Sequence, residues 1–320
     1  MAHKSPEQFS SLYELLDYFT DEQVCISYLE EQRWQGNMTC VHCNHDRVYT
    51  LQGANKRYKC ASCRKQFTAK ANTIFEDSKL PLRKWFAAIY LILAHRKGLS
   101  SYQLARDLKV TQKTAWFLGM RIRNAIKQGT FDKPLEGIVE VDETFVGGKN
   151  KNRHANKKVK YSQGRSYKDK TPVVGLVQRG GELRAFAVPD TKQETIQPIV
   201  EEQVQYGATV YTDEWWAYRQ LHNYYNHAIV NHAARQYVNG EAHTNTIEGF
   251  WGQFKRSIIG IYVKVSPQHL QRYVDEAVYR YNTKHLLDGH KALILLAKNT
   301  GSIKYKQLVH ASKKSNKKSS

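Results

Sequence analysis

Three carboxylates in the second half of the chain have the order and setting of a metal-dependent site for phosphodiester chemistry. Asp142 lies in a strand-like apolar run, Asp213 ends another such run, and Glu248 opens a helical segment. Attack on a phosphodiester by water or by a 3′-hydroxyl uses two cations, one at the nucleophile and one at the leaving oxygen. Magnesium takes hard oxygen ligands and keeps several waters, so a few carboxylates suffice to hold it. The three residues therefore predict a magnesium site that acts on nucleic acid.

Each carboxylate, taken alone, also has a purely structural explanation. Asp142 fits an exposed edge strand, because a charge without a partner is costly to bury. Asp213 stands at a strand end before a helix, where an aspartate often serves as the N-cap. Glu248 follows Asn245 by three residues, a spacing close to that of a capping box. The three structural explanations are independent of one another, whereas one shared metal site explains all three residues together.

Basic residues indicate the polymer on which such a site would act. Lys255 lies seven residues after Glu248, which is two turns along the same helix face, and Arg256 lies beside it. A cation at that place fits a phosphate of bound DNA. The whole chain carries 49 Lys and Arg against 29 Asp and Glu, a formal net charge of +20, which favours a polyanionic partner.

Four of the five cysteines form two pairs. Cys40 and Cys43 make one Cys-x2-Cys pair, and Cys60 and Cys63 make the other after a gap of 16 residues. This spacing predicts a four-cysteine zinc ribbon, in which each pair lies at a tight turn and the thiolates converge on one ion. Redox cysteines or coincidence are the alternative. Cys25 lies on the apolar face of a predicted helix and is expected in the core.

The segment after the cysteines has the proportions of a helix-turn-helix. A helix is predicted at 79–96, a short helix ends near 108, and a longer helix runs from 112 to 125. Within the longer helix, Gln112, Lys113 and Arg121 are candidates to face DNA. An ordinary helical hairpin is the alternative. At the N-terminus, Thr20 to Gln23 is predicted to form the capping box of a first helix.

The pattern changes from residue 137 onward to short β-branched or aromatic runs. Strands are predicted at 138–145, 171–178, 182–188, 208–212 and 228–231, and helices at 194–206, 214–221, 246–259 and 267–281. Neighbouring strands followed by alternating strands and helices predict an α/β domain with a mixed sheet flanked by helices. The segment 147–170 holds nine Lys and Arg against one Asp and is predicted to be a functional or disordered loop. The lysine-rich end, 312–320, is expected to be a disordered basic tail.

The acidic motifs resemble those of a known family. The blocks Glu140–Phe145, Tyr211–Glu214 and Asn245–Trp251, with Phe254-Lys255-Arg256, are similar to the Asp-Asp-Glu domain of cut-and-paste transposases, which has an RNase H-like fold. With the zinc ribbon, the chain resembles bacterial insertion-sequence transposases related to the eukaryotic Merlin group, over roughly residues 20–285. Some relatives carry asparagine at the third acidic position, so Asn245 challenges Glu248 as the third ligand.

The resemblance implies binding to terminal inverted repeats, DNA cleavage with Mg²⁺ or Mn²⁺, joining of 3′-hydroxyls to target DNA, and at least a dimer on DNA. A non-catalytic DNA-binding regulator and an RNase H-type nuclease are the rival functions. With no run of the roughly 20 apolar residues that a membrane span needs and no signal-peptide core, we expect a cytoplasmic, nucleoid-associated bacterial protein. The expected regions are a helical segment 1–36, the zinc ribbon 37–70, the helix-turn-helix 75–130, the catalytic domain 136–290 and a basic extension 291–320.

Overall fold

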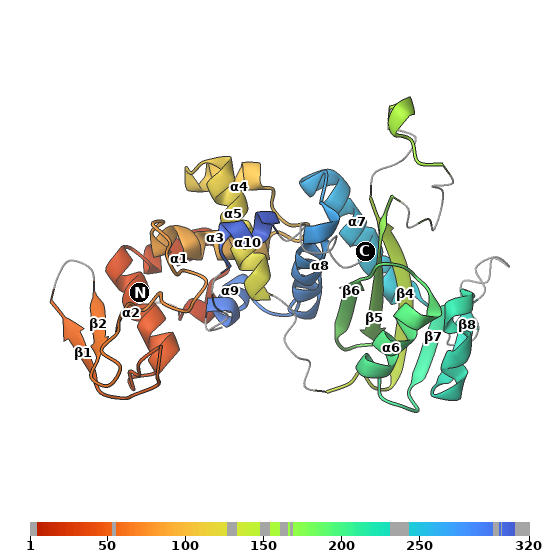
Figure 1. Ribbon diagram of the computed structural model, residues 1–320, viewed down its shortest axis with the longest axis horizontal. Coiled ribbons are helices and arrows are strands. Elements are labelled where there is room, and N and C mark those ends of the chain that lie inside the picture. The colour runs from red at the N-terminus through yellow and green to blue at the C-terminus, as the bar shows by residue number, and fades with distance from the viewer. Residues whose placement is uncertain are drawn as a thin grey trace, which may run out of the picture. The chain divides into compact units, whose positions relative to one another are not determined.

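The chain forms two compact units that are connected twice. The computed structural model describes residues 5–52, 56–126, 133–147, 154–160, 166, 169–230, 243–296, 301 and 303–310. The first unit contains Met1–Ile126 and Lys284–Ser320, and the second contains Lys127–Thr283 (Figure 1). Each unit is therefore described by itself.

The first unit begins with a 3₁₀ turn and two capped helices: η1 (Pro6–Gln8), α1 (Leu12–Tyr18) and α2 (Glu22–Trp34). Ser11 and Glu14 form a reciprocal capping box at the start of α1. The capping box predicted from Thr20 is wrong, because Asp21 is the N-cap of α2 and accepts from the N–H groups of Gln23 and Val24. The Asp21 carboxylate is charged, so it is a stronger hydrogen-bond acceptor for these amides than the hydroxyl of Thr20.

A small three-stranded antiparallel sheet follows α2. Its strands are β1 (Val48–Leu51), β2 (Arg57–Cys60) and β3 (Gln66–Phe67), in the order β1-β2-β3. Tyr58 and Phe67 are buried and meet Trp34 at the end of α2, with ring centroids 5.9 and 6.3 Å from the tryptophan. These aromatic contacts are the small apolar core through which the ribbon joins the helices.

The rest of the first unit is a helical core around α3 (Leu82–Ala94), whose residues from Trp85 to Leu93 are all buried. Two further helices, α4 (Ser101–Leu108) and α5 (Gln112–Ile126), contact α3 and are joined by a tight turn at Lys109 with left-handed backbone. The two helices and the turn lie where the helix-turn-helix was predicted. The turn is short because Lys109 and Val110 donate their N–H groups back to the last turn of α4, and Thr111 accepts from Thr114 at the start of α5.

The chain returns to the first unit after residue 283. Helix α9 (Asp288–Leu296) packs on α3 and on η1, where Gly289 N–H donates to Phe9 at 2.9 Å. A short helix, α10 (Tyr305–His310), buries Leu308. Residues 284–290, which we assigned to the catalytic domain, thus lie in the first unit, because the apolar positions Ala292, Leu295 and Leu296 are buried there.

The second unit is built on a five-stranded mixed sheet in the order β6-β5-β4-β7-β8. Its strands are β4 (Ile138–Val146), β5 (Thr171–Gln178), β6 (Leu183–Ala187), β7 (Thr209–Asp213) and β8 (Asn226–Val230). The first three pair antiparallel, and β7 and β8 pair parallel to β4. Parallel pairing of β4, β7 and β8 follows from the helical crossovers between them. The predicted α/β domain with a mixed sheet flanked by helices is confirmed.

Helices cover both faces of this sheet (Figure 1). On one face, α6 (Gln193–Gln203) and the 3₁₀ helix η4 (Trp216–Asn223) enclose a core that includes Val139, Val141 and Val174. The predicted helix at 214–221 is thus a 3₁₀ helix that begins two residues later. On the other face, α7 (Asn245–Ser257) places Trp251 and Ile247 against Gly175.

The remaining elements of the second unit secure α7 and the sheet edge. Helix α7 runs into a π-helical turn, η5 (Ile258–Tyr262), and then α8 (Pro267–Asn282) follows. Gln271 and Asn282 of α8 bond the backbone of β6, an edge strand whose outer amides would otherwise lack partners. The basic segment 147–170 includes a 3₁₀ turn, η3 (Ala155–Lys157), but most of it and the tail 312–320 lie outside the described residues. Among the described helices, none has both the length and the hydropathy that crossing a bilayer requires.

Candidate active site

The two aspartates lie at matching positions of adjacent parallel strands. Asp142 lies in β4, the central strand of the sheet, so the edge-strand explanation for this residue does not hold. The pairing of β4 with β7 sets Val139 beside Val210 and Glu140 beside Tyr211. The same register, continued by two residues, sets Asp142 beside Asp213. Because side chains alternate along a strand, both carboxylates share the face of Glu140, which α7 covers.

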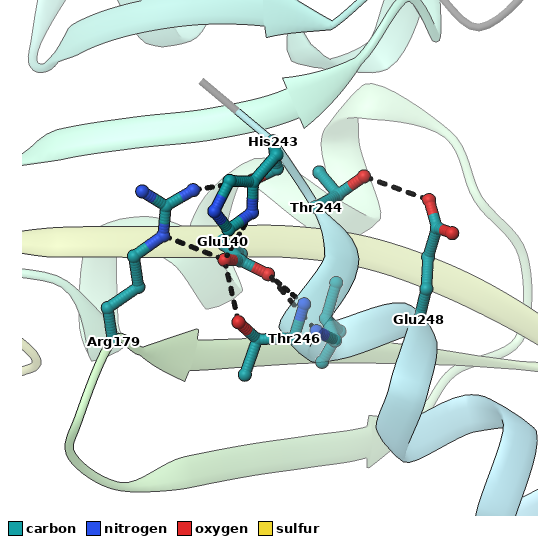
Figure 2. A network of polar contacts seen from close by, with 7 residues as sticks. Glu140, Arg179, His243, Thr244, Thr246 and Glu248 are labelled. Carbon is teal, nitrogen blue, oxygen red and sulfur yellow. Dashed lines mark hydrogen bonds and ion pairs between the residues drawn. The ribbon is translucent and has the colours of Figure 1, made fainter. Parts of the chain in front are cut away.

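Glu248 comes to this place from α7. Asn245, Glu248 and Lys255 are exposed and lie along one side of the helix, whereas Ile247, Trp251 and other residues bury the opposite side against the sheet. The hydroxyl of Thr244 donates to Glu248 Oε1 at 3.0 Å (Figure 2). This contact ties the carboxylate to the first turn of α7 and limits the directions in which the side chain can point.

Burial and neighbouring charges affect the ionisation of Asp142. The pKa of the Asp142 carboxyl is raised to about 8, first by burial, then by the negative charges of Glu143 and Asp213, with Glu248 adding to the effect. Neighbouring like charges and desolvation both disfavour the ionised form. A divalent cation removes both penalties, so the residues present fit a cation held by oxygen ligands.

The carboxylates are neighbours without forming a closed cage. Within the described part of the chain, the ligand atoms that lie within 4.8 Å of one another belong to the four cysteines, and the three acids do not meet that closeness. Magnesium keeps several waters and makes only one or two direct carboxylate bonds in many sites. An open arrangement therefore suits Mg²⁺ or Mn²⁺ with room for a DNA phosphate.

A fourth acid on this face was not singled out from the sequence. Glu140 is fully buried, and Arg179 Nε donates to its Oε1 at 2.8 Å. The N–H groups of Thr246 and Ile247 donate to its Oε2 at 2.9 and 3.1 Å (Figure 2). The period-two alternation that puts Glu140 on the face of Asp142 was the available signal. His243 has its Nδ1 3.3 Å from Glu140 Oε1.

The predicted zinc residues converge in the ribbon. The sulfur of Cys40 is 3.7 Å from that of Cys63, and the sulfur of Cys43 is 3.6 Å from that of Cys60. Four thiolates bound tetrahedrally to zinc at about 2.3 Å have their sulfurs about 3.8 Å apart. The cluster therefore fits Zn²⁺ without rearrangement. Cys25 is buried in α2, as expected.

Comparison with known sequences identifies a family for the two segments that carry these residues. Residues 20–66 match the transposase zinc-ribbon domain, and residues 134–282 match the ISXO2-like transposase domain. Over 242 residues the chain is 31% identical to a protein of the transposable element ISH50 from Halobacterium salinarum, covering 72% of this chain and 81% of that protein. The chain belongs to the ISXO2-like transposase family. The resemblance to insertion-sequence transposases that we inferred from the sequence is thereby confirmed.

The ISXO2-like transposase is also similar to two solved structures of the Mos1 transposase. One is a strand transfer complex, with 14% identity, a TM-score of 0.26 and coverage of 70% of this chain and 79% of that chain. The other is a pre-cleavage transpososome, with 12% identity, a TM-score of 0.19 and coverage of 72% and 82%.

The residues of this ISXO2-like transposase that we predicted to face DNA differ in their exposure to solvent. Arg121 is buried, donates to the backbone oxygen of Glu76 at 2.8 Å and lies against Trp85 and Phe117, so its predicted DNA contact is wrong. The reason is that the second half of α5 is enclosed by neighbouring helices on nearly all sides.

The first turn of α5 is more accessible in the same ISXO2-like transposase. Lys113 is exposed and lies over the ring of Tyr305 from α10, 5.2 Å from its centroid. Gln112 donates to Ser101 Oγ at 2.9 Å, which leaves its side chain only partly available. Lys255 and Arg256 are exposed in the last turn of α7.

Proposed function

We propose that this ISXO2-like transposase binds the terminal inverted repeats of its insertion sequence, cleaves the DNA there and joins the freed 3′-hydroxyls to target DNA. The observation that carries the proposal is the placement of Asp142 and Asp213 on adjacent strands with Glu248 on the covering helix. Burial first, and then the charges of Glu143, Asp213 and Glu248, raise the pKa of Asp142 to about 8. Acids gathered where ionisation is costly are typical of functional sites. A grouping of three acids that a divalent cation would neutralise suits phosphodiester chemistry.

The proposed reaction has two balanced steps. First, a water oxygen forms a bond to the phosphorus at the transposon end, the bond from phosphorus to the 3′-oxygen breaks, and the 3′-oxygen leaves as a hydroxyl. The proton of the attacking water passes to solvent. Second, this 3′-hydroxyl attacks a phosphodiester of target DNA, and the target 3′-oxygen leaves with a proton. No oxidant and no covalent protein–DNA intermediate is needed.

The residues of the chain would bind and orient the participants. Asp142, Asp213 and Glu248 would hold Mg²⁺ or Mn²⁺, which when bound activates the nucleophile and stabilises the leaving oxygen. We favour Glu248 over Asn245 as the third ligand, because a carboxylate brings the negative charge that a divalent cation prefers. Asn245 lies one turn earlier on the same exposed side of α7 and remains the alternative ligand.

The DNA would be held by basic residues outside the acidic site. Lys255 is two turns from Glu248 on one side of α7, where an ammonium group suits a phosphate beside the scissile bond. Lys113 and Gln112, at the start of α5, would contact the repeat sequence. We further propose that at least two copies assemble on paired ends, and that the protein works at DNA in the cytoplasm.

Cleavage of labelled end DNA tests the proposal. The protein is supplied with terminal-repeat DNA, target plasmid and Mg²⁺ or Mn²⁺, and Asp142→Asn, Asp213→Asn, Glu248→Gln and Asn245→Ala are compared with wild type. Loss of a metal-binding carboxylate should slow cutting and joining by about 10³-fold or more. Glu143→Gln and Glu214→Gln are the matched controls, since each removes a neighbouring carboxylate with no proposed metal contact.

Each outcome has a distinct meaning. Cutting that survives all three acid substitutions overturns the site. End binding without any cutting by the wild type indicates a regulator, and preference for an RNA–DNA hybrid indicates a nuclease. A larger loss in Asn245→Ala than in Glu248→Gln assigns the third ligand to the asparagine.

A further inference from the structure

Glu140 lies at the junction between the sheet and the start of α7. Its side chain is fully buried on β4, two residues before Asp142 and on the same face. The first amides of a helix have no acceptor within the helix and take one from a cap, usually the side chain of the N-cap residue. Here the N-cap residue Thr244 forms no side-chain cap bond to the helix and donates its hydroxyl to Glu248. Glu140 replaces it from a different element.

The cap is formed by both oxygens of the carboxylate. Oε2 accepts from the backbone N–H groups of Thr246 at 2.9 Å and Ile247 at 3.1 Å, and Oε1 accepts from the Thr246 hydroxyl at 2.9 Å (Figure 2). A negative charge at a helix N-terminus is also favoured by the helix dipole. The first turn of α7 is therefore fixed to one point of β4.

Arg179 secures the same junction from the turn after β5. Its Nε donates to Glu140 Oε1 at 2.8 Å, and its Nη2 donates to the backbone oxygen of His243 at 2.9 Å (Figure 2). The guanidinium lies over the ring of Tyr211, 4.8 Å from its centroid. The buried carboxylate is thus neutralised, and the chain that enters α7 is held at His243.

These contacts separate Glu140 from the three proposed metal ligands. Both of its oxygens already accept hydrogen bonds, so coordination of a cation by Glu140 would require breaking the cap of α7. Asp142 differs, because its pKa is raised by burial and negative neighbours. The acids of this face therefore divide into one that uses both of its oxygens to hold the helix and three that we propose as metal ligands.

We propose that Glu140 is a positioning residue, which fixes the start of α7 so that Glu248 is held opposite Asp142 and Asp213. This inference rests on the proposed function. Glu140 and Asp142 are about 7 Å apart along one strand, so the cap sets the helix relative to the strand that carries the first ligand. Magnesium demands near-ideal octahedral geometry, which makes a small displacement of Glu248 consequential. Residues that orient metal ligands typically change metal affinity or activity by about 10- to 100-fold when they are substituted.

Glu140→Gln is the decisive variant, because it keeps the volume but offers one acceptor oxygen where the carboxylate uses two. Either the helix amides or Arg179 must therefore lose their acceptor. Glu143→Gln is the matched control, since it removes a buried carboxylate from the same strand while its oxygen can still accept from Tyr218. For both variants, three quantities are measured in zinc-loaded protein: Mn²⁺ affinity without DNA, end-DNA affinity, and single-turnover cleavage at saturating DNA in Mg²⁺ and in Mn²⁺.

A positioning role predicts a selective loss in Glu140→Gln. Mn²⁺ affinity should fall about 10-fold, end-DNA affinity should stay within about 2-fold, and cleavage should fall about 10- to 100-fold in Mg²⁺ but less in Mn²⁺. Hydrogen exchange of residues 243–250 should be faster than in Glu143→Gln. A purely structural role would lower stability without changing the ratio of Mg²⁺ to Mn²⁺ rates, and that result overturns the inference.

Two further results keep the test decisive. If Glu140→Gln does not fold, Arg179→Lys retains the charge but loses the second hydrogen bond, and it should shift the same ratio to a smaller degree; an unchanged ratio overturns the inference. If wild-type protein cuts no DNA, the proposed function fails, and the Mn²⁺ affinities alone decide. Equal Mn²⁺ affinity in wild type and Glu140→Gln then overturns the inference that Glu140 is a positioning residue.

Discussion

Gly175 of β5 lies directly across the antiparallel ladder from Asp142 of β4. A Cβ at Gly175 would come within 2.5 Å of the Trp251 ring and 2.9 Å of Ile247, both on α7. The missing side chain therefore lets α7 approach the sheet next to the aspartate. The distance of Glu248 from Asp142 depends on this close approach as well as on the cap at Glu140.

Gly175→Ala should accordingly displace α7. We expect a loss of about 1–3 kcal/mol in unfolding free energy, because a methyl group is added to a filled space, together with slower DNA cleavage. Urea unfolding and single-turnover cleavage measure the two effects. Gly249→Ala on α7 is the control, since nothing lies within 4 Å of its added Cβ. That variant should be neutral or slightly stabilising. Equal behaviour of the two variants would show that α7 does not depend on Gly175.

Lys113 and Arg121 should have different roles although both are basic residues of α5. Lys113→Ala should weaken end-DNA binding, because the residue is exposed and can contact a phosphate. The dependence of the DNA-binding constant on salt concentration should fall by about the amount expected for one phosphate contact. Arg121→Ala should mainly lower stability, by about 1–3 kcal/mol, since a buried hydrogen bond and ring contacts are lost.

Binding isotherms at several salt concentrations and thermal melts distinguish the two substitutions. Tyr305→Ala controls for the ring under Lys113, because it removes the contact but no charge. A salt slope that changes with Arg121→Ala and not with Lys113→Ala would reverse the assignment.

Zinc should be required by the ribbon and not by Cys25. Cys60→Ser should reduce the zinc content from about one ion per chain to a small fraction, because one of four ligands is lost. End-specific DNA binding should fall with it, since the ribbon has few apolar contacts besides Trp34, Tyr58 and Phe67. Elemental analysis and DNA-binding assays measure both.

Cys25→Ala is the matched variant for the zinc prediction. Burial and the nearby Glu22 raise the pKa of the Cys25 thiol to about 12, so it is an inert core residue at neutral pH. Its zinc content and end binding should equal those of the wild type. Normal end binding by a zinc-free Cys60→Ser protein would contradict the role of the ribbon.

Most residues of the candidate sites could be proposed from the sequence because their signals are local. The zinc ligands follow from the spacing of two cysteine pairs, and Asp142, Asp213 and Glu248 each stand at a recognisable place in a strand or helix. Arg121 was misjudged because the burial of α5 depends on helices far away in the sequence. The cap at Glu140 joins residues on β4 and α7, and local spacing cannot reveal a bond between two such elements.

The return of α9 to the first unit was not predicted for the same reason. The apolar residues of α9 indicate a buried helix, but nothing nearby in the sequence says that the surface it covers is α3. Pairing of this kind is set by shape and by apolar area across the whole unit. The end of the second unit at Thr283 therefore came from the structure.

The ionisation of Asp142 should make the second unit less stable as pH rises. Folding raises the pKa of this carboxyl from 3.8 to about 8, so the folded, magnesium-free protein binds the proton more tightly than the unfolded chain does. Between these pH values ionisation stabilises only the unfolded chain, so the contribution of Asp142 to folding stability decreases as pH rises. Asp142→Asn cannot ionise, so its free energy of unfolding should exceed that of the wild type as pH rises. This difference should grow between pH 5 and pH 8 to on the order of 1–3 kcal/mol.

Urea unfolding in zinc-containing, magnesium-free buffer measures the difference in unfolding free energy between Asp142→Asn and the wild type. Hydrogen exchange of the β4 and β5 amides shows whether the difference lies in this sheet. Asp190→Asn is the control, since hydrogen bonds from Thr195 and from the Lys192 amide lower the pKa of Asp190. Because the pKa of Asp190 lies below this pH range in both the folded and the unfolded states, its substitution should have an effect that does not change between pH 5 and pH 8. Adding Mg²⁺ should stabilise the wild type more than Asp142→Asn. A gain for Asp142→Asn that is the same at pH 5 and pH 8 would show that the carboxylates are not held together at a free-energy cost, and the proposed cation site would lose its main support.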